Sequence, residues 1–254
     1  MKKHLLILAA LLLVVLLPMT RAAEPGRIVF MIGEDEYHTW ETLPDFAEKD
    51  LKPLGYRVTI IKADAADRNN FPGLVAALRD ADLLFLSVRR RTLPKDQLDA
   101  VRAHLAAGKP LVGIRTASHA FSPLRDQPLD PKLVAWLEFD PEVLGGHYSD
   151  HYGNAPVTVT LASGAETHSI LKGVPVNKLI GHGGLYKNTP LEKTATPLLL
   201  GTILGHPSEP IAWTHRYGQK QARVFYTSLG HWDDFANRSF RILLVNGVTW
   251  ALNK

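Results

Sequence analysis

The feature that most constrains this fold is an alternation of short apolar runs with segments of helical periodicity, which begins near residue 27. The apolar runs, which we interpret as strands, are residues 27–32, 56–61, 82–88 and 111–114. The segments of helical spacing are residues 39–54, 74–78 and 94–107. Strands that alternate with helices predict βαβ units around a parallel sheet. Continuous apolar runs agree with this prediction, because parallel strands are buried on both faces.

The second half of the chain shows a different pattern. Its expected elements are an alternating strand at 157–161, a hairpin of 211–214 and 223–228, and a closing helix at 235–252. Between the two halves we expect an irregular insertion at about 120–155. The chain has neither a Gly/Ser-rich linker nor an internal repeat, so we predict one domain over residues 26–252.

The absence of cysteine excludes several kinds of chemistry. None of the 254 residues is cysteine, so there is no disulfide, no thiolate nucleophile and no cysteine-ligated metal or cluster site. The hydrophobic share of 46% and the charged share of 21% exclude a disordered chain, a collagen and a coiled coil. The sequence also lacks the GxxxxGK, GxGxxG, HExxH and GxSxG patterns, which disfavours nucleotide binding and the common serine and zinc hydrolases.

Residues 1–22 have the composition of a secretory signal peptide. Two lysines at the start precede an apolar run of 13 residues at 5–17, which is shorter than the ~20 residues needed to span a bilayer as a helix. Small residues at positions 20 and 22 predict cleavage after Ala22. We therefore expect a periplasmic or secreted protein with no membrane attachment once the signal is removed. An uncleaved membrane anchor is the alternative.

Removal of the signal also changes the charge balance. The whole chain has 29 basic and 25 acidic residues. The signal carries three of the basic residues and no acidic residue, which leaves 26 basic against 25 acidic residues and a net charge of +1. The sequence has no basic stripe interleaved with aromatic residues, so we expect no nucleic-acid partner.

Polar residues follow four of the predicted strands. In chain order these segments are Gly33-Glu34-Asp35-Glu36-Tyr37-His38, Arg89-Arg90-Arg91, Arg115-Thr116-Ala117-Ser118-His119 and Gly230-His231-Trp232-Asp233-Asp234. Ligands of open α/β sheets bind at the carboxyl ends of the strands. We therefore expect these segments to converge on one rim. For the three arginines, a solvated basic loop that does not reach the site is the alternative.

Histidine is the second signal of a site. The mature chain keeps ten histidines, and four of them directly follow glycine: His147, His182, His206 and His231. Histidine suits general acid–base catalysis, because its pKa lies near neutral pH. A divalent metal is an alternative, and its ligands would come from His147, His151, His182, His231 and Asp233.

Aromatic residues near the histidines suggest the type of ligand. Those in or beside the histidine-rich segments are Tyr37, Trp40, Tyr148, Tyr152, Tyr186 and Trp232. Sugars bind by stacking on aromatic faces, although any one of these rings would also serve as core. We assign Trp136, Trp213 and Trp250 to the core.

Three stretches of the chain resemble the trehalose-utilisation (ThuA-like) family. They are LVGIRTASHAF at 111–121, GGHYSDHYG at 145–153 and RVFYTSLGHWDDF at 223–235. The resemblance extends over residues 27–252. That family is similar in fold to the class I glutamine amidotransferases. The resemblance therefore implies an α/β fold, a flavodoxin-like three-layer sandwich with a mostly parallel sheet.

The same resemblance indicates which activity has been lost. The amidotransferase nucleophile is the cysteine of a G-I-C elbow between a strand and a helix, and the matching residues here are Gly113-Ile114-Arg115. Arginine stays protonated and cannot act as a nucleophile. The His-x-Glu part of the amidotransferase triad has a counterpart in His231-Trp232-Asp233. We therefore expect no glutamine amidotransferase activity.

The resemblance implies a role in the use of a carbohydrate, either a trehalose-like disaccharide or a keto-sugar. In the enzyme hypothesis, His231 is the general acid or base, Asp233 orients it, and Arg115 polarises a substrate oxygen. The predicted substrate-binding residues are Tyr37, His38, Ser118, His119, His147, His182 and Trp232. A non-catalytic sugar-binding or accessory module and a metal-dependent sugar hydrolase or isomerase are the alternatives. The substrate, the reaction and the oligomeric state stay open at this point.

Overall fold

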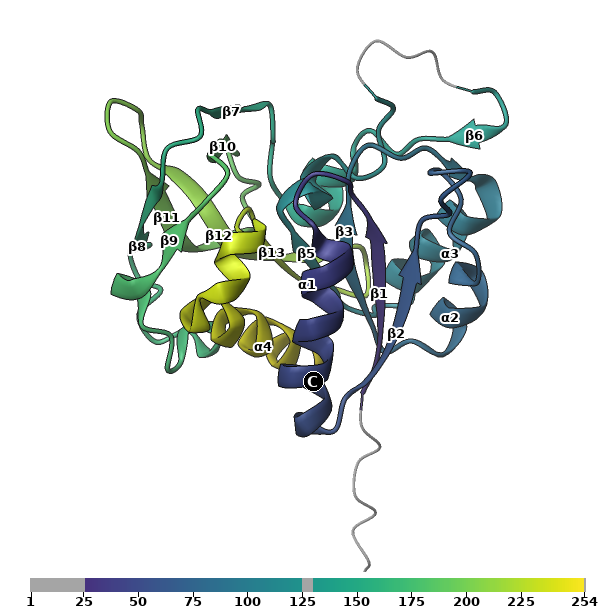
Figure 1. Cartoon of the computed structure of the whole chain (residues 1–254), viewed down its shortest axis with the longest axis horizontal. Helices are drawn as coiled ribbons and strands as arrows, with labels where there is room; N and C mark the ends of the chain where they lie inside the picture. The colour runs from purple at the N-terminus through teal and green to yellow at the C-terminus, as the bar shows by residue number, and fades with distance from the viewer. Residues whose placement is uncertain (1–25, 125–129, 254) are drawn as a thin grey trace, which may run out of the picture.

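The computed structural model describes residues 26–124 and 130–253, so the predicted signal peptide at 1–22 lies outside the described residues. Its centre is a nine-stranded sheet (Figure 1). In spatial order the strands are β2 (Arg57–Lys62), β1 (Arg27–Gly33), β3 (Leu83–Val88), β5 (Leu111–Ile114), β13 (Ala222–Thr227), β12 (Glu209–Tyr217), β11 (Thr196–Thr202), β8 (Val157–Leu161) and β9 (Ile180–Gly181).

The sheet has a parallel core. Strands β2, β1, β3, β5 and β13 pair in parallel, as the apolar runs of the sequence predict. Strand β12 pairs antiparallel with β13 in the predicted hairpin, and β11, β8 and β9 continue the antiparallel extension. The carboxyl ends of β1, β3, β5 and β13 therefore lie side by side at one edge of the sheet.

Helices cover both faces of the sheet and complete the predicted flavodoxin-like three-layer sandwich (Figure 1). Helices α1 (Thr39–Phe46) and α4 (Arg238–Leu252) pack on one face, and α2 (Leu74–Asp80) and α3 (Lys95–Ala106) pack on the other. Strand β1 shows why, because Phe30 faces the α1 and α4 layer while Met31 faces the α2 and α3 layer. Both residues are fully buried.

Several short elements complete the fold. They are β4 (Leu93–Pro94), β6 (Leu133–Val134), β7 (Asp150–Tyr152), β10 (Leu185–Lys187), the π-helical turns Ala47–Leu51 and Asp140–Leu144, and the 3₁₀ turns Lys52–Leu54, Arg115–His119, Ser169–Leu171, Val176–Lys178 and Trp232–Ala236. The segment predicted as an irregular insertion contains β6, one π-helical turn and β7. No described helix is both long and apolar enough to cross a bilayer.

Three of the differences between the sequence prediction and the structure have a local cause. The helix predicted at 39–54 changes to π-helical and then 3₁₀ geometry after Phe46, and Pro53 lies in its last turn, where it has no N–H to donate. The closing helix begins later than predicted because the Asn237 side chain caps it by accepting the N–H of Ser239 at 2.9 Å. Strand β11 is missing from the prediction, and Pro197 and Gly201 lie within it.

The tryptophan assignments agree with the structure. Trp213 is fully buried and Trp136 is 8% exposed. Trp250 is half-buried and packs against the core cluster beneath α4.

Close packing of α4 on β13 makes Gly247 a sensitive position. A Cβ at Gly247 would overlap the ring of Phe225. We expect Gly247→Ala to lower the free energy of unfolding by about 1–3 kcal/mol, because overpacking outweighs the gain in helix propensity. Urea denaturation measures this change. The control is Gly153→Ala, where a Cβ meets no atom within 4 Å, and equal stability of the two variants would contradict the prediction.

Candidate functional site

The four polar segments that follow the strands meet at one edge of the sheet, as expected, because β1, β3, β5 and β13 are parallel neighbours. After three of these strands the backbone turns through a left-handed conformation at a residue other than glycine. The residues are His38 (φ 53°), Arg90 (φ 49°) and Arg115 (φ 42°). Such conformations are strained and gather at functional sites.

Glu34 organises the first of these segments. Its buried carboxylate accepts the N–H groups of Glu36 (2.7 Å), Tyr37 (2.6 Å) and Thr39 (2.7 Å). It also accepts the hydroxyl of Thr39 at 2.6 Å. These bonds fix the turn between β1 and α1, so that the ring of Tyr37 lies 4.2 Å from the guanidinium carbon of Arg115.

Arg115 occupies the elbow after β5 and is 1% exposed. Its Nη1 donates to the carbonyl of Ser228 at 2.9 Å, and its Nη2 donates to the carbonyl of Gly183. The guanidinium group lies between the rings of Tyr37 and Tyr186, 4.2 and 4.7 Å from their centres. In this arrangement Arg115 holds protein groups in place, and its direct contact with a substrate oxygen stays a prediction.

His231 and His182 lie together beside the elbow, with ring centres 6.0 Å apart. The buried carboxylate between them is Asp234. It accepts the N–H of His231 at 3.0 Å and lies 2.7 Å from Nδ1 of His182. Burial, followed by the charge of Arg115, lowers the pKa of His231 below its ordinary value. The lowered pKa favours the neutral form of His231, and its Nδ1 accepts the N–H of Asp233 at 3.3 Å.

Asp233, predicted to orient His231, is 54% exposed and has its carboxylate 3.4 Å from Nδ1 of His231. Orientation of His231 by Asp233 therefore stays a prediction. Sequence reasoning missed the role of Asp234. Asp234 lies three residues after His231, the N-cap of a helical turn, and an acidic residue at that position is typical of a capping box.

An aromatic group covers the histidine side of the site. The ring of Trp232 is 3.6 Å from that of His231, and His38 lies 5.3 Å from Trp232 and 4.7 Å from Trp40. Trp232 is 43% exposed. This is the type of surface on which sugars stack.

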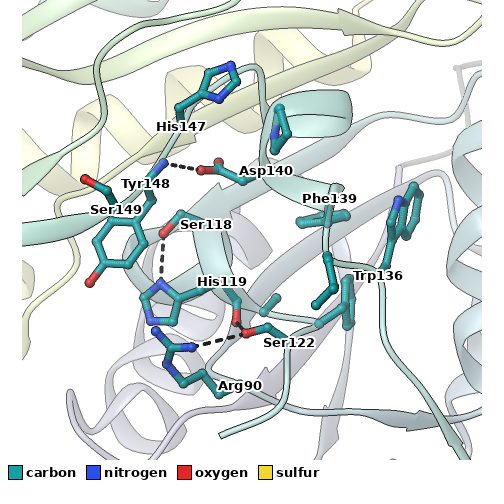
Figure 2. A pocket seen from close by; sticks show the side chains of 14 residues that line it. Arg90, Ser118, His119, Ser122, Trp136, Phe139, Asp140, His147, Tyr148 and Ser149 are labelled. Carbon is teal, nitrogen blue, oxygen red and sulfur yellow. Dashed lines mark hydrogen bonds between the residues drawn. The ribbon is translucent and has the colours of Figure 1, made fainter. Parts of the chain in front are cut away.

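Two adjoining cavities lie at the same edge of the sheet. The larger of the two cavities has a volume of about 340 Å³. It is lined by three of the predicted substrate-binding residues, Ser118, His119 and His147, and by Asp140 (Figure 2). The smaller cavity, of about 260 Å³, is lined by Tyr37 and Tyr186 among others. Both cavities share three wall residues: Arg90, His119 and Tyr148. The other predicted site residues, Arg115, His38, His182, His231, Trp232 and Asp233, do not line these two cavities.

A stack of rings connects the cavities to the elbow. His119 stacks on Tyr148 at 4.6 Å, and Tyr148 lies 4.6 Å from Tyr186, whose ring contacts Arg115. Sequence analysis noted both tyrosines only as sugar-stacking candidates. Their positions depend on the pairing of β7 with β10, which brings residues 150–152 and 185–187 together.

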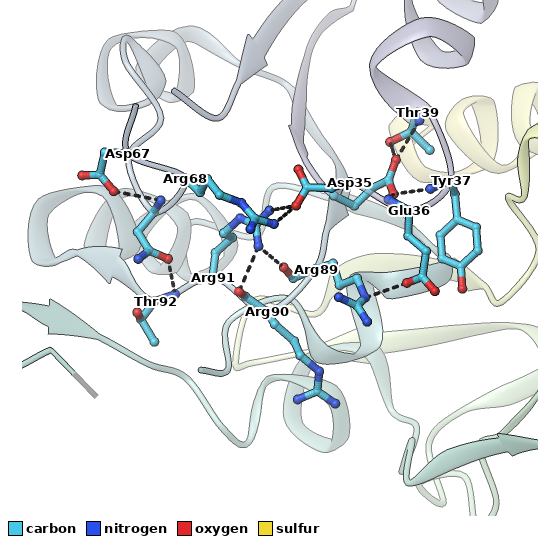
Figure 3. Close-up of polar contacts among 12 residues, drawn as sticks. Asp35, Glu36, Tyr37, Thr39, Asp67, Arg68, Arg89, Arg90, Arg91 and Thr92 are labelled. Atoms are coloured by element: carbon cyan, nitrogen blue, oxygen red, sulfur yellow. Dashed lines mark hydrogen bonds and ion pairs between the residues drawn. The ribbon is translucent and has the colours of Figure 1, made fainter. Parts of the chain in front are cut away.

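The arginine loop is not simply solvated. Arg91 is 2% exposed and binds Asp35 at 2.6 Å, and Arg68 also pairs with Asp35 (Figure 3). Arg89 pairs with Glu36 at 2.8 Å and lines the smaller cavity. Arg90 lines both cavities. The alternative of a solvated basic loop is therefore wrong for Arg91, and two of the three arginines reach the cavities.

The proposed metal ligands do not come together in the structure. Within residues 26–124 and 130–253, no three histidine, aspartate or glutamate side chains form a set that would hold a metal ion. His147 pairs with Glu192 at 2.9 Å, whereas His182 pairs with Asp234. The metal-dependent alternative therefore stays a prediction without a ligand set among the described residues.

Asp140 is a buried acid that sequence reasoning missed. Its Oδ2 accepts the N–H of Tyr148 at 2.6 Å, while burial raises the pKa of the carboxyl to about 7. The folded chain thus keeps a proton that the unfolded chain releases near pH 4, so the free energy of unfolding falls as the pH rises from about 4 to about 7.

The side chain of the Asp140→Asn variant does not titrate. We expect the free energy of unfolding of this variant, relative to that of wild type, to rise by about 2 kcal/mol between pH 5 and pH 7. Urea denaturation at the two pH values measures the difference, and a constant difference would contradict the prediction.

Comparison with known proteins now identifies the family. The sequence matches the family model described as ThuA, trehalose utilisation, over residues 36–251. This chain belongs to the ThuA family. No curated protein matches it.

Solved structures agree with the ThuA fold. A ThuA-like protein from Bacteroides uniformis has a TM-score of 0.66 and 18% identity, and the match covers 92% of this chain and 95% of that one. A ThuA-like protein from Parabacteroides merdae has a TM-score of 0.63 and 18% identity, with 90% of each chain covered. A β-galactosidase from Bacillus circulans has a TM-score of 0.53 and 11% identity over 89% of this chain and 30% of that chain. At these identities the likeness shows the fold alone.

Proposed function

We propose that this ThuA-family protein is exported and acts on a carbohydrate, either a trehalose-like disaccharide or a keto-sugar, by histidine acid–base chemistry. The observation that carries the proposal is the edge of the sheet at the carboxyl ends of β1, β3, β5 and β13. Two cavities there are walled by stacked histidine and tyrosine rings, and Tyr37 of the smaller cavity has its ring 5.7 Å from that of His231. Export rests on the signal-like residues 1–22.

The chemistry that we assign to His231 follows from its surroundings. The lowered pKa favours the neutral ring of His231, and we assign to this ring the role of accepting a proton from a substrate hydroxyl or from water. The carboxylate of Asp233, 3.4 Å from Nδ1, then stabilises the imidazolium. Arg115 holds the carbonyls of Ser228 and Gly183, and so shapes the loops on both sides of His231.

We also propose that the protein does not hydrolyse glutamine. The elbow position that holds cysteine in the amidotransferases is Arg115, and the chain has no cysteine. A buried arginine bonded to two carbonyls offers neither a nucleophile nor open space at that point.

One observation favours a second candidate function, a sugar-binding module without catalysis. Both Nη atoms of Arg115 donate to protein carbonyls, which is an arrangement that a structural arginine adopts. Such a module binds the sugar and returns it unchanged, so turnover separates the two functions.

The experiment is a thermal-shift screen of the mature protein against mono-, di- and keto-sugars, combined with elemental analysis and followed by turnover assays. A sugar-induced shift with turnover in metal-free protein supports the proposal. A shift without turnover favours the binding module. A stoichiometric metal required for turnover, or no response to any sugar, contradicts it.

A further inference from the structure

A third cavity lies at the edge of the sheet opposite to the candidate site, which is the lower edge in Figure 1. Its lining residues lie at or just before the start of β1, β3, β5 and β13, at the end of β12 and at the end of α4. Its volume of about 870 Å³ lies within the ~300–1,000 Å³ typical of ligand pockets. We call it the basal cavity. It is separate from the candidate site, whose residues follow the carboxyl ends of the same strands.

Positive charge dominates the lining of the basal cavity. Its basic residues are Arg27, Lys109, Arg216 and Arg223, and the one acidic residue among the described residues that line it is Asp82. Asp82 pairs with Arg27, whose Nε lies 3.3 Å from the carboxylate. Within residues 26–124 and 130–253, neither Arg216 nor Arg223 forms an ion pair with a carboxylate. The charge of these two arginines is therefore not offset by a described acidic residue in contact with them.

The two arginines also repel each other. Arg216 of β12 and Arg223 of β13 are directly opposite in the antiparallel pair, and like charges at such positions are destabilising. Arg223 is half-buried, and its burial together with the charge of Arg216 lowers the pKa of its guanidinium group. An anion that contacts both guanidinium groups removes this repulsion.

Trp250 of α4 holds both guanidinium groups in place. The guanidinium carbons of Arg216 and Arg223 lie 5.8 and 5.3 Å from the centre of its ring. Nη1 of Arg223 donates to the carbonyl of Trp250 at 2.7 Å, and Nη1 of Arg216 donates to the carbonyl of Gln221 at 3.3 Å. In the part of the chain that the structure describes, Nη2 of each arginine has no hydrogen-bond partner. Paired guanidinium groups with N–H donors to spare suit a carboxylate or a phosphate group.

The rest of the lining is partly apolar. Tyr56, Ala251 and Leu252 contribute an aromatic ring and two aliphatic side chains. The hydroxyl of Tyr56 lies 3.3 Å from that of Thr249, which fixes the tyrosine against α4. An inorganic ion would leave this apolar surface in water, whereas an organic anion covers it and gains the free energy of apolar burial.

We propose that the basal cavity binds a small organic anion whose carboxylate or phosphate group bridges Arg216 and Arg223. The apolar part of the ligand lies against Tyr56 and Leu252. The proposal goes beyond the proposed function, because it concerns a second site at the other edge of the sheet and uses none of the histidines. A concave site with an apolar wall suits a soluble ligand better than it suits the surface of a membrane.

The test is isothermal titration calorimetry of the mature protein with phenyl phosphate, inorganic phosphate and phenol. We expect phenyl phosphate to bind at least about 10-fold more tightly than inorganic phosphate, because its ring is buried against the apolar wall. Phenol, which lacks the anionic group, should give no measurable binding. Arg216→Gln and Arg223→Gln should each weaken the binding of phenyl phosphate by about 10- to 100-fold, because a charge-assisted hydrogen bond is lost. Arg216→Lys should have a smaller effect, since it keeps the charge and loses only the planar fork.

A matched variant at the other edge of the sheet separates the two sites. Arg89 lines the smaller cavity of the candidate site, and Arg89→Gln should bind phenyl phosphate as the wild type does. Circular dichroism reports the fold of each variant, and the exposed position of Arg216 keeps the test valid even where Arg223→Gln unfolds.

Several results would overturn the inference. They are equal affinity for phenyl phosphate and inorganic phosphate, undiminished binding in both arginine variants of the basal cavity, and loss of binding in Arg89→Gln. Sedimentation of the protein with phosphatidylglycerol vesicles, without binding of phenyl phosphate, would assign the two arginines to a membrane surface and would overturn it too. Each of these results leaves the proposed function standing.

Discussion

Replacement of His231 by asparagine is expected to reduce turnover of the sugar substrate by about 10²- to 10⁴-fold, the usual contribution of a general acid or base. Asparagine is also a good N-cap residue, so the helical turn that His231 begins at Trp232–Ala236 should persist. Steady-state kinetics with the sugar found in the ligand screen measures the loss, and circular dichroism reports the fold.

The pH profile gives a second readout of the same residue. Burial and Arg115 lower the pKa of His231, so the basic form persists below pH 6.5. Turnover should therefore decline only as the pH falls below about 6.5, and it should lose this acid limb in the asparagine variant. The matched control is His206→Asn, since His206 also follows a glycine but is exposed. Wild-type turnover in the His231 variant would remove His231 from the mechanism.

Replacement of Arg115 by alanine is expected to lower the free energy of unfolding by about 3–5 kcal/mol, comparable to truncation of a large buried ring. Three effects add up at this position. The carbonyls of Ser228 and Gly183 lose their donors, Tyr37 and Tyr186 lose the cation between them, and a cavity opens at the elbow. Chemical denaturation measures the loss.

Arg238→Ala, at an exposed position of α4, is the matched control and should change stability by no more than about 0.5 kcal/mol. A loss below 1 kcal/mol in the Arg115 variant would show that the guanidinium group does not hold the elbow together. Arg115 would then be available for direct contact with a substrate, as the sequence analysis predicted.

Local sequence patterns predicted the parallel part of the fold well, because a strand buried on both faces must be apolar throughout. Strands β1, β3 and β5 are of this kind. The same reasoning could not find β11, since its Pro197 and Gly201 disfavour a strand locally and only its pairing with β12 and β8 offsets that cost.

The candidate site also has a part that the sequence predicted and a part that it did not. Its rim was predictable, because parallel strands bring their carboxyl ends to one edge and the residues after β1, β3, β5 and β13 are polar. The sequence did not predict which of several similar residues would be buried at the site. Asp233 and Asp234 are adjacent in the sequence, yet Asp233 is exposed and Asp234 is 1% exposed and bound to His182.

The sequence by itself determined the fold class, the family, the absence of a thiol nucleophile and the edge of the sheet where we place the candidate site. The family followed from the resemblance of three stretches, and the others depend on residue type and on periodicity along the chain. Only the tertiary structure decided that Arg115 faces two carbonyls and two tyrosine rings, and that Arg90 and His119 share a cavity wall. These contacts join residues far apart in the chain. Their formation depends on the order of the strands and on burial, which no local pattern encodes.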